Sequence, residues 1–119
     1  MKFREWIDES KVTIKANIRN KINKELSNLT SPNNKTQYFN RIPLKDISDI
    51  LKKYGVIMLQ EDNTEWSGFL TGASVTTNFT LAPIDSKSGE FYTPYTNTSL
   101  ALQWHKMPSG KYEINCYMG

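Results

Sequence analysis

The fold is decided by residues 99–118, which read SLALQWHKMPSGKYEINCYM. Two runs of alternating apolar and polar residues, 99–107 and 111–118, flank a turn that contains Pro108 and Gly110. Pro108 fits the first central position of a type I turn. Gly110 can take the left-handed conformation of a bulge, which gives a three-residue loop. The segment therefore predicts a β-hairpin.

The length of this loop determines which residues face each other. A bulged three-residue loop places apolar pairs on one face, namely Leu100 with Met118, Leu102 with Cys116, and Trp104 with Ile114. A two-residue loop would set Leu102 against Asn115 and mix the two faces. We therefore expect the bulged register, in which His105 faces Glu113 on the polar side.

The N-terminal part of the chain is predicted to be helical. Over residues 2–29, apolar residues recur every three or four positions and form one stripe: Phe3, Ile7, Ile14, Ile18, Ile22, Leu26 and Leu29. Alternation over residues 12–18 also fits a half-buried strand. We favour helix over residues 2–29, with a break near Ser10 as the alternative to one continuous helix, because the helical period continues through Ile22 and Leu26.

Further elements follow between this helix and the hairpin. Residues 36–41 suit a short strand or an extended connection. A second helix is expected over 43–55, with Pro43 in its first turn and Gly55 at its C-terminal end. Strands 56–61 and 65–70 are predicted as a hairpin with a polar tip, and 75–82 as a further strand. Residues 83–98 form the longest loop.

These elements predict a single α+β domain over residues 1–119. Residues 1–55 form its basic helical part, and residues 56–119 form an antiparallel sheet. We expect two helices, the first long and basic, packed on one face of a four- or five-stranded sheet. With 119 residues, of which 38% are hydrophobic, the chain is long and apolar enough to fold around one core.

Cysteine content and the absence of long apolar runs limit the class of protein. Cys116 is the single cysteine, so an intramolecular disulfide and a CxxC site are excluded. The charged N-terminal residues do not resemble a secretory signal. No apolar run approaches the roughly 20 residues of a membrane-spanning helix. We therefore expect a cytoplasmic protein that does not enter a membrane.

Charge is distributed unevenly along the chain. Residues 1–55 carry twelve Lys and Arg against six Asp and Glu, and residues 56–119 carry three against six. Lys11, Lys15 and Arg19 are spaced by four and line one edge of the first predicted helix. Such cations can contact phosphates or an acidic protein. Equally, long basic side chains commonly border an apolar stripe without binding anything.

The long loop carries aromatic residues in a polar setting. Phe91, Tyr92 and Tyr95 surround Pro94. Exposed aromatics are typical anchors of protein interfaces, so Tyr92 and Tyr95 are candidate partner-binding residues. The alternative, which we favour slightly, is that these rings fold back over one end of the sheet.

Chemistry-bearing residues are sparse. His105 is the single histidine, and its expected neighbour Glu113 makes proton transfer possible. We interpret the pair as a cross-strand surface contact, because no activated nucleophile is evident. One histidine also makes a His-based metal site improbable. The sequence predicts no catalytic residue, no metal site and no cofactor.

Two segments carry a resemblance to known proteins: IPLKDISDILKKYGV at residues 42–56 and LQWHKMPSGKYEI at residues 102–114. Both resemble stretches of small, mostly uncharacterised proteins from phages and mobile elements of AT-rich Gram-positive bacteria. Proteins of that kind include anti-CRISPR and other anti-defence inhibitors, which work by binding. The resemblance carries over no catalytic or binding residue.

We therefore expect a non-enzymatic binding protein from a phage or mobile element. It would occlude a host protein or nucleoprotein complex through the basic helix or the aromatic loop, with Lys11, Lys15, Arg19, Tyr92 and Tyr95 as contact residues. Direct binding of nucleic acid is an alternative. A further alternative is a small enzyme that uses His105 and Glu113.

Overall fold

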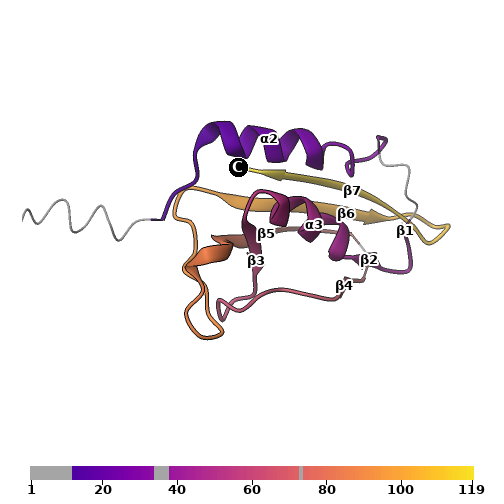
Figure 1. The fold of residues 1–119 in the computed structure, drawn as a ribbon. Helices are drawn as coiled ribbons and strands as arrows, with labels where there is room; N and C mark the ends of the chain where they lie inside the picture. Colours follow the sequence, from indigo (N-terminus) through magenta and orange to yellow (C-terminus); the bar gives the residue numbers. More distant parts are fainter. Residues whose placement is uncertain (1–11, 34–37, 73) are drawn as a thin grey trace, which may run out of the picture.

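A computed structural model of the chain describes residues 12–33, 38–72 and 74–119. Figure 1 shows the order of the elements along these residues. They are α2 (Ala16–Leu26), β1 (Tyr38–Phe39), β2 (Ile42–Pro43), α3 (Lys45–Lys53), β3 (Val56–Leu59), β4 (Phe69–Leu70), β5 (Val75–Pro83), a 3-10 helix (Ile84–Ser86), β6 (Ser99–Lys106) and β7 (Lys111–Met118).

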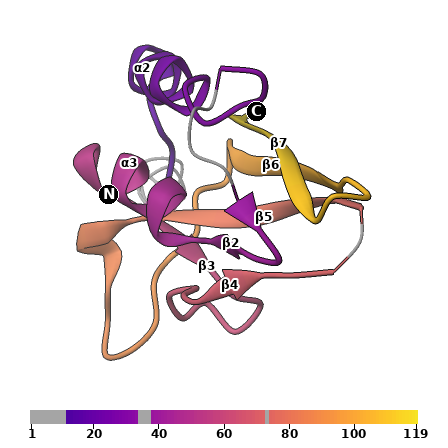
Figure 2. The same ribbon diagram turned by 90° about the vertical axis from the view of Figure 1, so that its right-hand side faces the viewer.

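The strands form one large sheet and one small one. Five antiparallel strands follow the order β1-β7-β6-β5-β3, and β2 pairs with β4 separately. The large sheet is curled, as the view along it shows (Figure 2). The α+β class with a five-stranded antiparallel sheet is therefore confirmed.

The C-terminal hairpin has the predicted register. Leu102 is paired with Cys116, and His105 is paired with Glu113. The Met107 amide donates to the Lys111 carbonyl at 2.8 Å, which closes the three-residue loop. Gly110 has a φ of 89°, the left-handed conformation that the bulge requires. Turn chemistry and alternation over this stretch were sufficient to predict it.

The predicted hairpin between 56–61 and 65–70 forms only next to its tip, and its predicted length is wrong. The Gln60 amide donates to the Thr64 carbonyl at 2.8 Å, Leu59 and Glu65 form a bridge, and the Trp66 amide donates to the Met58 carbonyl at 2.8 Å. On its other edge β3 pairs with β5, and β4 pairs with β2. All four residues of β3 are buried, so this strand has no polar face to fix a hairpin register.

The helix predicted over 2–29 does not include residues 12–15 in the structure. Residues 2–11 lie outside the described residues, residues 12–15 are not helical, and α2 begins at Ala16. The Asn97 side chain binds the backbone of Ile14 in place of helical partners, because it accepts a hydrogen bond from the Ile14 amide at 3.0 Å and donates to the Ile14 carbonyl at 2.9 Å. The prediction of helix over 12–15 is thus corrected by a contact from the long loop.

The second helix also begins later than expected. Pro43 lies in β2 and is paired with Phe69, so α3 begins at Lys45. Its C-terminal end agrees with the prediction, because Gly55 has a φ of 73° and its amide donates to the Lys52 carbonyl at 3.1 Å.

The core joins both helices to the large sheet. One cluster of buried side chains combines residues of α2 and α3 with residues of β5, β6 and β7, including Ile22, Leu26, Ile47, Leu51, Leu81, Leu100, Leu102 and Met118. A second cluster contains Ile57, Leu59, Ala82 and Tyr92. Because Ile57 alternates with Met58 of the first cluster, the second cluster covers the opposite face of β3.

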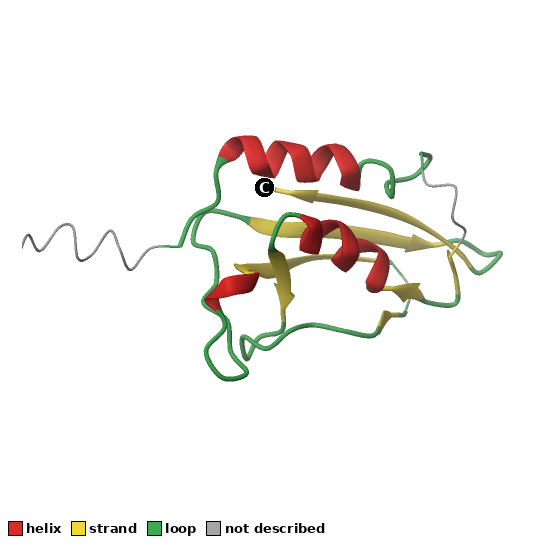
Figure 3. Cartoon of the chain, viewed as in Figure 1, coloured by secondary structure: helices red, strands yellow, loops and turns green. Residues whose placement is uncertain are grey.

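Side chains from α2 and the turn after it bind the edge of β7, beside which α2 lies (Figure 3). The Asn23 side chain accepts a hydrogen bond from the Met118 amide at 2.6 Å and donates to the Met118 carbonyl at 2.9 Å. Thr30 Oγ1 accepts from the Cys116 amide at 3.3 Å, and Ser31 Oγ accepts from the Ile114 amide at 3.2 Å. The edge thereby positions α2.

We expect Asn23→Ala to lower the free energy of unfolding by about 1–3 kcal/mol, because it leaves a strand amide and carbonyl without partners. Urea denaturation followed by circular dichroism measures this change. Asn20→Ala is the matched control, since Asn20 is exposed on the same helix; its effect should stay within about 0.5 kcal/mol. Equal effects of the two substitutions would contradict the role of Asn23.

Candidate binding surface

Basic side chains lie along two edges of α2, with Lys15 and Arg19 on one edge and Lys21 and Lys24 on the other. Lys15 precedes its first residue, and its carbonyl accepts hydrogen bonds from the Ile18 and Arg19 amides, both at 3.1 Å. Lys15, Lys21 and Lys24 are exposed, and Arg19 is half-buried. We call these four residues the α2 basic surface. Lys11, also predicted for this surface, lies outside the described residues.

The lysines of α3 differ from the α2 basic surface because each has a carboxylate partner. Lys45 lies 2.6 Å from Asp49, Lys52 lies 2.8 Å from Glu65, and Lys53 contacts Glu25. Within residues 12–33, 38–72 and 74–119, no such ion pair involves Lys15, Arg19, Lys21 or Lys24. The α2 basic surface therefore keeps its positive charge available for a partner.

Glu25, the acidic residue of α2, faces α3 and does not neutralise the α2 basic surface. It accepts hydrogen bonds from Lys53 Nζ and the Tyr54 hydroxyl. These bonds, that from Lys53 first, lower the pKa of Glu25, and the same contacts raise the pKa of Lys53 and of Tyr54. Glu25 stays ionised and ties α2 to α3.

Negative charge gathers on a different part of the molecule. Glu61 and Asp62 lie in the turn after β3, and Glu90 lies in the long loop. The Tyr92 amide donates to the Asn63 carbonyl at 2.9 Å, which joins this turn to the long loop. Both lie at the bottom of the view in Figure 1, whereas α2 lies at the top. The basic residues of α2 and the acidic residues of the turn and the long loop thus lie on different sides of the molecule.

The aromatic side chains of the long loop differ in how far they are exposed. Tyr92 is only 8% exposed and packs in the second cluster. Tyr95 is half-buried against the main core, and burial, followed by the charge of Asp85, raises its pKa. Phe91 is 54% exposed. The two tyrosines proposed as contact residues therefore fold back onto the domain, and we leave Tyr92 out of the binding surface.

His105 has a neighbour that the sequence did not reveal. Its Nδ1 lies 2.6 Å from Ser74 Oγ, and Glu113 faces it across the strands. A serine beside a histidine is the arrangement of a nucleophile and its base. All three side chains are exposed on the sheet, however, and β6 is paired on both sides up to Trp104. Its amides are thereby engaged and do not form an oxyanion hole.

A groove of about 500 Å³ lies between α3 and residues 65–69. Leu44, Trp66 and Phe69 contribute apolar surface to it. Its basic rim residues, Lys45 and Lys52, are the ones paired with Asp49 and Glu65, so the rim has no excess charge. Among the described residues, no group of three or more His, Cys, Asp and Glu side chains could hold a metal ion.

Comparison with protein-family models, with curated proteins and with solved structures gave no match. No helix within the described part of the chain is both long and apolar enough to cross a membrane. The α2 basic surface is therefore judged on its geometry and charge alone.

Proposed function

We propose that the chain is a non-enzymatic binding protein that covers an acidic surface of a host protein or nucleoprotein complex with α2. One observation carries this proposal. The cations of α2 form no ion pair within the described residues, whereas every lysine of α3 does. A helix whose cations lack internal partners is complementary to a negatively charged partner, and such complementarity speeds and orients association.

The attachment of α2 supports a role in binding. Asn23 fixes the helix to β7, and Glu25 fixes it to α3. A surface that is already ordered loses less conformational entropy when a partner docks.

The resemblance of residues 42–56 and 102–114 to phage and mobile-element proteins supports the biological side of this proposal. Under it, the chain is an anti-defence or anti-CRISPR-like inhibitor that acts in the cytoplasm by occlusion. Neither segment contains a residue of α2. The resemblance therefore supports an origin in a phage or mobile element, and the contact residues are inferred from the unpaired charges of α2.

Direct binding of nucleic acid is the second candidate for the same surface. Lysine and arginine side chains contact phosphates as readily as carboxylates, so the unpaired cations favour it equally. The two candidates differ in what the partner contains. Binding to a protein survives nuclease treatment of the partner, and binding to nucleic acid does not.

The test compares two variants with equal loss of charge. The first replaces Lys15, Arg19, Lys21 and Lys24 with Gln. The control replaces Lys45, Lys52, Lys87 and Lys106 with Gln, because none of these residues contacts α2 and exposed ion pairs contribute little to stability. Each tagged protein is used to capture partners from a nuclease-treated extract of an AT-rich Gram-positive bacterium. Captured proteins are quantified by mass spectrometry, and circular dichroism verifies folding.

We expect the α2 variant to lose at least about tenfold of the captured partner, because several charge contacts are removed together. The control variant should retain the partner, and the partner's own activity should fall when the wild type is added. Capture that is equal for both variants, or that is insensitive to moderate salt, would remove the proposal. Loss of capture by wild type after nuclease treatment would favour nucleic-acid binding instead.

A further inference from the structure

A second positively charged surface lies at the end of the molecule that carries β1, β2 and β4. The Arg41 guanidinium lies over the Phe69 ring, 4.0 Å from its centroid. Both side chains are exposed, and Phe69 is 49% exposed although it is a large apolar residue. The β2–β4 ladder holds this ring in place, because Phe69 is paired with Pro43.

A second exposed ring is held next to Arg41 by a tight turn. Phe39 is 49% exposed and is paired with Lys111 of β7. Asn40 has a φ of 66°, and its amide donates to the Gly110 carbonyl at 3.2 Å. The Arg41 amide then donates back to the Phe39 carbonyl at 2.8 Å. The turn therefore ties the backbone of residues 39–41 to the tip of the C-terminal hairpin.

The cations at this end have no carboxylate partner among the described residues. These cations are Arg41, Lys106 and Lys111. Lys106 is paired with Tyr112, its Nζ lies 5.9 Å from the centroid of that ring, and it is on the opposite face of the hairpin from Lys111. Of the carboxylates nearby, Asp46 accepts a hydrogen bond from the Tyr38 hydroxyl at 2.5 Å, and Glu113 lies two residues after Lys111. Positive charge is thus in excess beside the exposed rings.

We propose that Phe39, Arg41, Phe69 and Lys111 form a stacking patch that binds single-stranded nucleic acid. Exposed aromatic rings and arginine planes stack on unpaired bases, and flanking cations contact the phosphates. Double-stranded nucleic acid satisfies only the cations, because its bases are already stacked. An acidic protein also satisfies the cations, but it offers no flat group to the Phe39 ring or to the Arg41 guanidinium stacked on Phe69.

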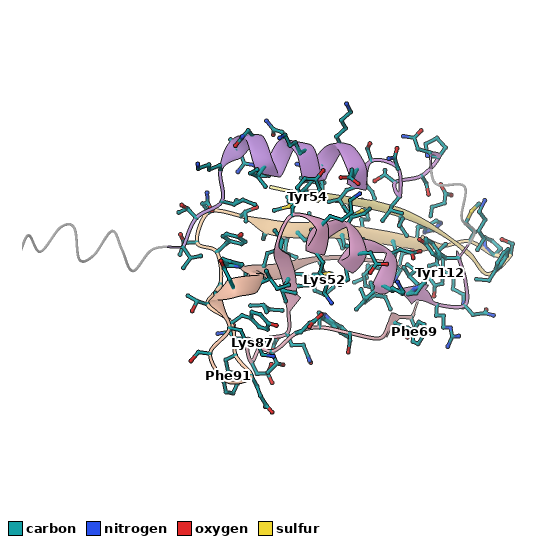
Figure 4. All side chains as sticks on the ribbon, viewed as in Figure 1. Lys52, Tyr54, Phe69, Lys87, Phe91 and Tyr112 are labelled. Atoms are coloured by element: carbon teal, nitrogen blue, oxygen red, sulfur yellow. The ribbon has the colours of Figure 1, made fainter. Side chains whose placement is uncertain are left out.

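The stacking patch is separate from the α2 basic surface and does not depend on it. Its residues come from β1, the turn between β1 and β2, β4 and the C-terminal hairpin, which lie at the right of the view in Figure 1, whereas α2 lies along the top. Phe91, the exposed ring of the long loop, lies far from Phe69 (Figure 4). It is therefore a matched control for an exposed phenylalanine outside the patch.

The test measures fluorescence anisotropy of the full chain with two labelled strands of equal length. One is a twelve-nucleotide oligothymidylate, and the other is an abasic strand with the same phosphates. We expect wild type to bind the thymidylate at least about fivefold more tightly, since stacking one base adds that much or more. Phe39→Ala and Phe69→Ala should each reduce this ratio, and Phe91→Ala should leave it unchanged.

Arg41→Lys tests the stacking role of the guanidinium group, because it keeps the charge and removes the flat donor group. It should weaken binding of the thymidylate and leave binding of the abasic strand unchanged. Lys21→Gln with Lys24→Gln should affect the two strands equally, because any contribution of α2 is limited to phosphates. Failure of the stacking patch is therefore distinguishable from failure of the proposed role of α2.

Two results would overturn the stacking patch. One is a wild-type ratio close to one for the two strands, or a ratio that Phe39→Ala and Phe69→Ala leave intact. The other is tight binding of polyglutamate that depends on the same two rings, which would assign the patch to an acidic protein. Circular dichroism of each variant shows whether the fold is retained, as expected for exposed positions.

Discussion

Leu102→Ala should lower the free energy of unfolding by about 2–5 kcal/mol, the range for a leucine removed from a packed core. Leu102 is fully buried, at 0% exposure, in the middle of β6. It is paired with Thr77 on one side and with Cys116 on the other. Its removal leaves a cavity where both hairpin strands meet the helices. Urea denaturation followed by circular dichroism measures the change.

The neighbouring residue provides the control for this prediction. Gln103 is exposed on the opposite face of the same strand, so Gln103→Ala should change the free energy of unfolding by no more than about 0.5 kcal/mol. This comparison also tests the register, because a shift by one residue would exchange the two faces. Gln103→Ala costing more than Leu102→Ala would contradict the hairpin described above.

Native Cys116 should react with a thiol reagent at least about a hundredfold more slowly than in the urea-unfolded chain. Burial raises the pKa of its thiol from 9.0 to about 11, despite a hydrogen bond with Thr30 that lowers it. At neutral pH this difference alone reduces the reactive thiolate about a hundredfold, and burial hinders access further. Absorbance of the released thiol product, with and without urea, measures the two rates.

The same pKa difference predicts how stability depends on pH. Between pH 9 and about 11 the unfolded chain has lost the Cys116 proton, while the native chain retains it. The unfolded state then binds fewer protons, so the free energy of unfolding falls as pH rises through this range. Cys116→Ala should show a shallower fall than wild type, because only the contributions of the other groups with a raised pKa remain, namely Tyr54, Tyr95, Lys45 and Lys53. Equal slopes, or fast native labelling, would contradict a buried thiol.

The C-terminal hairpin was predictable because everything that specifies it lies close together in the sequence. Pro108 and Gly110 determine the turn, and the alternation on both sides determines the register. The pairing of β2 with β4 was not predictable in this way. Ile42 and Leu70 are distant in sequence, each strand has only two residues, and neither shows an alternation that could be recognised.

The same distinction applies to the candidate surfaces. Lys45 and Asp49 are four residues apart on one helix, so their ion pair can be inferred from sequence. The pairing of Lys53 with Glu25 depends on how two helices meet, and only the structure reveals that the α3 lysines are neutralised while those of α2 are not. The contact of Arg41 with Phe69 likewise joins two segments whose pairing was not expected.

The hydrogen bonds that Asn23, Thr30 and Ser31 make with β7 also limit how another protein can dock. A strand supplied by a second chain needs free amide and carbonyl groups along the edge that it extends. On β7 the amides of Ile114, Cys116 and Met118 already have side-chain acceptors from the same chain. A partner that binds on this side of the molecule must therefore contact side chains. It cannot add a strand to the sheet there without first displacing α2.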